Sequence, residues 1–72
     1  MYMRRAEEVK KSLSKIIEEG GKPTARTIAQ ELDYSVQDVH RCLNYLEKKR
    51  EIRSYNKEFS NQQYRFVSLF RE

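Results

Sequence analysis

Residues 27–52 decide the fold of this chain, and they read TIAQELDYSVQDVHRCLNYLEKKREI. Apolar side chains recur three or four positions apart on both sides of a central break, which is the spacing of one face of an α-helix. Thr24 predicts the start of a short helix over 25–32, and Ser35 predicts the start of a longer helix over 36–49. Both hydroxyls can accept from backbone N–H groups of a first helical turn. We therefore expect two helices joined by a tight turn.

One further helix is expected before this pair. Residues 2–19 carry an apolar stripe at helical spacing, with lysines and glutamates on the other side. The stripe consists of Ala6, Val9, Leu13, Ile16 and Ile17. Gly20 and Gly21 should end this helix, because glycine readily takes the left-handed backbone that follows a last turn. These glycines mark one connection and no domain boundary, so 1–72 is expected to form a single domain.

Two strands are expected after the helices. Residues 52–56 and 62–67 are rich in Ile, Tyr, Phe and Val, and a polar stretch separates them. A five-residue connection suits an antiparallel hairpin, and Asn61 is its residue best able to accept a positive φ. Tyr64 and Phe66 alternate as expected core residues of the second strand. The predicted fold class is mainly α with a small antiparallel β-hairpin, that is, three helices and then a hairpin.

Composition excludes several classes of protein. The chain has 72 residues, of which 38% are hydrophobic and 36% are charged. It has no apolar run near the roughly 20 residues of a membrane-spanning helix, and its start lacks the apolar segment of a secretory signal. One cysteine and one histidine supply neither an internal disulfide nor a structural zinc site. We expect a cytoplasmic protein without a metal or other cofactor.

Catalysis is not expected from these residues. The sequence contains no serine–histidine–aspartate set and no glycine-rich phosphate loop. Cys42 is interpreted as a small apolar residue beside Leu43 rather than as a redox thiol. The protein is therefore predicted not to be an enzyme.

Charge indicates a polyanionic partner. Fifteen Lys and Arg against eleven Asp and Glu give a formal net charge of +4. The excess lies in residues 35–72, which hold eight basic and five acidic side chains, whereas residues 1–34 hold seven and six. A basic half of this kind is typical of nucleic-acid binding, and a solvated surface with spare lysines is the alternative interpretation.

Residues 27–52 resemble a bacterial winged helix-turn-helix. In such domains an Ile-Ala-x-x-Leu pattern ends the second helix, a serine caps the recognition helix, and a Leu-Glu-Lys-Lys run leads into the wing. The matching residues here are Ile28, Ala29, Leu32, Ser35, Val39, Leu43, Leu46, Glu47, Lys48, Lys49 and Ile52. The small size and layout are closest to the FaeA/PapI-type regulators of pilus operons. Such domains usually carry glycine where this chain has Asp33 and Arg50.

The resemblance implies a fold of three helices plus a wing. It also implies sequence-specific binding of double-stranded DNA by a bacterial or phage transcriptional regulator in the cytoplasm, associated with the nucleoid when bound. The third helix, about 36–49, would enter the major groove. The wing, about 52–67, would lie on the flanking backbone or in the minor groove.

The candidate DNA-binding residues lie on the third helix, the wing and the start of the second helix. Arginine can bond guanine, Gln and Asn can match adenine, and an exposed Val can meet a thymine methyl. Those on the outer face of the third helix are Val36, Gln37, His40, Arg41, Asn44 and Lys48. The expected phosphate contacts lie on the same side as that helix and are Arg26, Arg53, Lys57 and Arg65. Lys57 has a second interpretation, in which its side chain inserts into the minor groove. An ordinary solvated polar surface is the alternative for each.

Two other functions remain open. A winged-helix adaptor or host-factor inhibitor would bind protein through Phe59 or Leu69-Phe70. Phe59 could equally fold back as a lid or insert into a groove. The Zα domains, which grip left-handed nucleic acid, are a less favoured match, because His40, Asn44 and Tyr64 stand in their key places and the wing lacks proline.

The oligomeric state is predicted from apolar surface. The Tyr2-Met3 end of the first helix and Leu69-Phe70 beyond the last predicted strand have no assigned core partner. These few side chains fall short of the roughly 1,200 Å² of a stable interface. We expect a monomer in solution that pairs, if at all, only on DNA.

Overall fold

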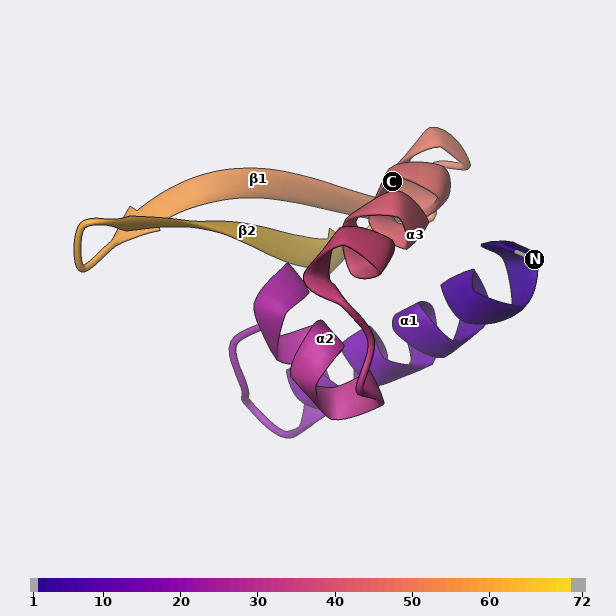
Figure 1. Ribbon diagram of the computed structural model, residues 1–72, viewed down its shortest axis with the longest axis horizontal. Helices are drawn as coiled ribbons and strands as arrows, with labels where there is room; N and C mark the ends of the chain where they lie inside the picture. The colour runs from indigo at the N-terminus through magenta and orange to yellow at the C-terminus, as the bar shows by residue number, and fades with distance from the viewer. Residues whose placement is uncertain (1, 71–72) are drawn as a thin grey trace.

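The chain folds into three helices followed by a two-stranded antiparallel hairpin, as predicted (Figure 1). The computed structural model describes the backbone of residues 2–70 and the side chains of residues 4–70. The elements are α1 (Tyr2–Glu18), α2 (Ala25–Leu32), α3 (Val36–Lys48), β1 (Ile52–Phe59) and β2 (Gln62–Leu69). None of the helices in the described part of the chain has the length and apolar character that a membrane crossing requires.

The helix ends follow the predicted local chemistry. The Thr24 and Ser35 side chains accept from the backbone N–H groups three residues later, which caps α2 and α3. Gly20 has φ +75° after α1, and the Gly21 N–H donates to the Ile16 carbonyl at 2.9 Å, as in a Schellman end. Asp33 takes the left-handed conformation (φ 58°) in the turn between α2 and α3. Local residues thus set the end of α1, both ends of α2 and the start of α3.

The core lies where the three helices and the base of the hairpin meet. Its fully buried large side chains include Leu13 of α1, Ile28 of α2, Leu43 of α3 and Ile52 of β1. Removing such surface from water is the main force that holds elements of this size together. Ile17 was expected on the α1 stripe but is 40% exposed, and it is the next-to-last residue of α1.

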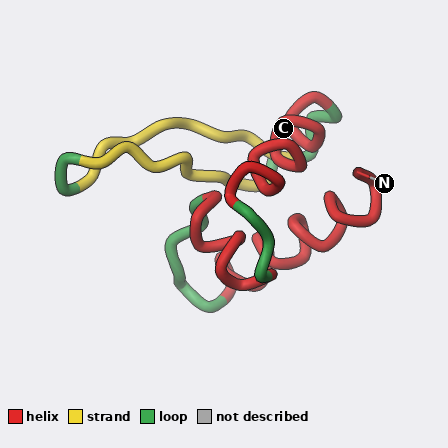
Figure 2. The backbone as a smooth tube through the Cα atoms, viewed as in Figure 1, coloured by secondary structure: helices red, strands yellow, loops and turns green. Residues whose placement is uncertain are grey.

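The hairpin is longer than the sequence predicted. Its strands run to Phe59 and from Gln62, so the turn is only Ser60-Asn61, with φ values of 53° and 65°. Two positive φ values suit a two-residue turn whose twist matches that of paired strands. The positive φ at Asn61 confirms the prediction, whereas the five-residue connection was wrong. Figure 2 shows the hairpin extending far beyond the helices.

The connection between α1 and α2 joins the edge of β2. Thr24 forms an antiparallel bridge with Phe66, and the Val67 N–H donates to the Pro23 carbonyl at 2.7 Å. Strand β2 is therefore anchored on both sides at its base, while its distal half pairs only with β1. Val67 is buried, but Tyr64 and Phe66 are only partly buried. The prediction that these two aromatic residues form the strand core was wrong, because they lie on the face opposite Val67.

Candidate nucleic-acid interface

The outer face of α3 carries a polar stripe. Successive residues of a helix are rotated by about 100°, so positions four, seven and eleven residues apart lie along one line. The residues on this line are Gln37, Arg41, Asn44 and Lys48, all exposed. They lie opposite the buried Val39 and Leu43, and no carboxylate stands among them. The helix thus presents base-reading side-chain types to solvent on a line that contains no acid.

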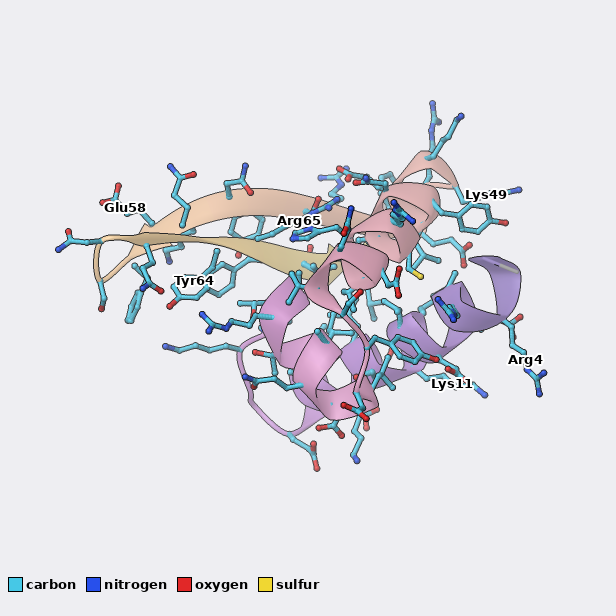
Figure 3. The ribbon with its side chains drawn as sticks, viewed as in Figure 1. Arg4, Lys11, Lys49, Glu58, Tyr64 and Arg65 are labelled. Atoms are coloured by element: carbon cyan, nitrogen blue, oxygen red, sulfur yellow. The ribbon has the colours of Figure 1, made fainter. Side chains whose placement is uncertain are left out.

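Arg65 of β2 fastens the hairpin to α3. Its side chain is 15% exposed, and its Nη2 donates to Asn44 Oδ1 at 2.9 Å and to Glu47 Oε1 at 3.0 Å. The Ser54 hydroxyl of β1 donates to the same Glu47 oxygen at 3.0 Å. Figure 3 shows Arg65 and Tyr64 leaving β2 on opposite sides. Arg65 was predicted as a phosphate contact, and in this structure its guanidinium is paired with the half-exposed Glu47 of the same chain.

His40 completes this network as a neutral ring. Arg65 Nη1 donates to His40 Nδ1 at 3.1 Å, because a guanidinium can only donate. Partial burial, and then the nearby Arg65 charge, lower the pKa of His40 below its usual value. The ring therefore carries its proton on Nε2 at neutral pH. His40 can offer one hydrogen bond to a base but adds no positive charge.

A groove connects the start of α3 with the start of α2 and the free edge of β2. Its volume is about 260 Å³, and Val36, His40, Arg26 and Arg65 are among its lining residues. Four of the ten predicted residues therefore come together around one depression, with Val36 43% exposed beside it. The groove lies beside the first two turns of α3, which carry Val36 and His40.

The two remaining hairpin cations lie elsewhere. Arg65 pairs with Asn56 across the strands, so the alternation of β1 puts Arg53 and Lys57 on the opposite face. The Arg53 guanidinium stands 4.6 Å from the centre of the Phe70 ring, and Lys57 stands over Phe66 at 5.9 Å. The expectation that all three hairpin cations share one side with α3 was wrong, because Arg65 lies on the face of Asn56 while Arg53 and Lys57 lie on the other face of β1.

Several functional residues were missed at the level of sequence. Glu47 and Ser54 take part in the Arg65 network, and Lys22 stands 4.1 Å from the centre of the Phe59 ring. A signal for Glu47 existed, since it follows His40 by seven positions and so shares its side of α3. Lys22 gave no local signal, because its partner is a residue of the distant hairpin turn.

The predicted protein-binding residues have partners within the chain. Phe59 is 49% exposed and turns back toward Lys22, as in the lid interpretation. Leu69 belongs to β2, faces Ile52 and packs against the core, so the expectation that it lacks a partner was wrong. Phe70 is half-buried beside Arg53. The side chains of Tyr2-Met3 lie outside the described ones.

The Cys42 thiol and the Asp38 carboxylate both have roles in holding the fold together. Cys42 is buried, and this burial raises the pKa of its thiol, as suits a small core residue. The Asp38 carboxylate of α3 pairs with Arg5 of α1 at 3.4 Å. Within the side chains that the structure describes, no three His, Cys, Asp or Glu residues gather as a metal site would require.

Comparison with known proteins finds no similar family, protein or structure. The chain matches no family model, and neither a curated protein nor a solved structure is detectably similar to it.

Proposed function

We propose that this protein binds double-stranded DNA in a sequence-specific manner and regulates transcription in a bacterial or phage system. The polar stripe of α3 carries the proposal. It presents an arginine, two amides and a lysine, all exposed, along one side of the helix. The order of elements and the resemblance of residues 27–52 to a winged helix-turn-helix support the same function.

The contacts divide into readout and anchoring. Gln37 and Arg41, in the first half of α3, would reach base edges, and Lys48 would contact phosphate. Arg26 would anchor the backbone beside the groove, while Lys57 would anchor it at the hairpin. Arg65 acts as a positioning residue: because it holds the Asn44 carbonyl oxygen, the amide NH₂ of Asn44 stays available for a base.

Selection from random duplexes at low salt, followed by titration of the selected site, tests the proposal. Arg41→Ala should weaken binding by about 1–3 kcal/mol and relax the preference at one base pair. Lys57→Ala should weaken all sequences alike and reduce the slope of affinity against salt by about one unit. Lys11→Ala, an exposed α1 lysine far from the stripe, is the matched control and should change neither quantity.

The competing function is that of a protein-binding adaptor. Tyr55 and Phe59, two exposed aromatic residues on one strand, favour it as a second candidate. No duplex retardation at micromolar protein would support the adaptor and contradict DNA readout. Unchanged preference in Arg41→Ala would contradict the assignment of α3 as the reading helix.

A further inference from the structure

A second cavity lies beneath the hairpin, away from the polar stripe of α3. Its volume is about 280 Å³, and its walls come from three segments: the α1–α2 connection, α2 and the distal hairpin. The hairpin contributes three aromatic rings, Phe59, Tyr64 and Phe66, and the opposite wall contributes Lys22 and Arg26. Figure 3 shows Tyr64 on the side of the hairpin that faces α2.

The three rings lie on one face of the hairpin because of its register. Phe59 faces Gln62 and Tyr64 faces Lys57, so the strand alternation places the rings together on the face opposite Arg65. Phe59 is 49% exposed, and the other two rings are partly buried. A ligand can therefore reach aromatic ring faces without any change in the core.

The charge of the cavity selects an anion. Its lining contains two cations and no carboxylate. The Lys22 ammonium lies 4.1 Å from the centre of the Phe59 ring, so charge and ring face stand side by side. Two more cations, Arg53 and Lys57, continue along the same face of β1 beyond the cavity. A flexible polyanion could follow this row.

A ligand that fits must offer both a planar ring and a negative charge. A volume of about 280 Å³ is just below the range of roughly 300–1,000 Å³ that holds drug-sized ligands, so it suits one ring system. We propose that this cavity binds one base of a single-stranded nucleic acid. The base stacks against Phe59 and Tyr64, and Lys22 and Arg26 contact the flanking phosphates.

Binding exchanges partners without breaking the fold. The base takes the place of the Lys22 ammonium above the Phe59 ring, and the released ammonium pairs with a phosphate oxygen. Arg53 and Lys57 guide the rest of the strand along the hairpin. This activity goes beyond the proposed duplex readout, since it uses no residue of the α3 stripe.

The test is a titration of the whole protein with two fluorescently labelled strands of equal charge, a deoxythymidine decamer and its fully abasic counterpart. The wild type should bind the thymidine strand about tenfold more tightly, the size of one base–aromatic stack. Phe59→Leu should bind both strands with the affinity that the wild type shows for the abasic one. Tyr45→Leu, a change of a partly buried ring on α3 that lies outside the cavity and has its own cation, Lys49, at 5.7 Å, should behave as the wild type.

Three results would overturn the proposal. If the wild type bound the two strands with equal affinity, only the phosphate charges would contribute to binding. An equal loss in Tyr45→Leu would mean that the strand has no preference for the rings of this cavity. If thymidine monophosphate displaced the labelled strand at the same concentration as unlabelled decamer does, the cavity would be a small-molecule pocket. Arg41→Ala separates the two functions, because it should bind the decamer as the wild type does while its binding to the selected duplex weakens.

Discussion

At the scale of single residues, Arg50 takes a conformation that favours glycine. It follows α3 with φ 59°, and its N–H donates to the Glu47 carbonyl at 3.0 Å. The next N–H, of Glu51, donates to the Leu46 carbonyl at 3.0 Å. This pair of bonds repeats the end of α1, where Gly20 occupies the same place. The turn into the hairpin thus holds a residue other than glycine in a left-handed backbone conformation.

Arg50→Gly should raise the free energy of unfolding by about 0.5–1 kcal/mol. Relief of roughly 1–2 kcal/mol of left-handed strain is partly offset by the greater freedom of glycine in the unfolded chain. Urea denaturation measures the change. Lys49→Gly, at a right-handed position with φ −80°, should instead lower stability. An equal gain in Arg50→Ala would assign the effect to lost charge and contradict this account.

At the scale of elements, Arg65 is the main polar connection between the hairpin and α3. Its guanidinium reaches three α3 side chains, of which Glu47 is the charged one. The hairpin projects from the body (Figure 1), so this contact in the middle of β2, opposite Asn56, sets its direction relative to the α3 stripe.

Arg65→Gln should lower the free energy of unfolding by about 1–2 kcal/mol, because the bonds to a charged partner are lost and Glu47 is left half-exposed without its cation. Thermal and urea unfolding give the measurement. Arg53→Gln, on the exposed face of the same hairpin, should stay within about 0.5 kcal/mol of the wild type. Equal effects of the two changes would show that the network adds nothing to an ordinary surface arginine.

At the scale of the whole molecule, the described exposed apolar side chains are spread over several elements. The large ones are Ile17 on α1, Val36 on α3, and Tyr55 and Phe59 on β1. No element gathers the area of a stable dimer, which is roughly 1,200 Å² in total. The packing of Leu69 against the core removes one of the two surfaces that could have paired.

We therefore predict a monomer at micromolar concentration. Sedimentation should return the mass of one chain, 8.7 kDa. A mass about twice as large that reverts to one chain in Phe70→Ser would contradict this and make the end of β2 a dimer contact. A dimer unaffected by Phe70→Ser would contradict it equally and place the contact elsewhere.

The sequence by itself determined the helices and their ends. Thr24, Ser35 and Gly20 act on backbone groups within three or four residues of themselves, so their effect is visible in the local pattern. The outward direction of Gln37 and Arg41 was also predictable, because helical periodicity fixes each side chain relative to the apolar stripe.

Only the tertiary structure decided how the hairpin serves the site. Arg65 looked like a free cation in sequence, because its partners Asn44 and Glu47 lie 21 and 18 positions away. The rings of Tyr64 and Phe66 looked like core residues, since alternation gives two faces but not which face is buried. The docking of the hairpin against α3 and of Pro23 against β2 made that choice. Contacts between distant segments have no local pattern, so they appear only when the chain is folded.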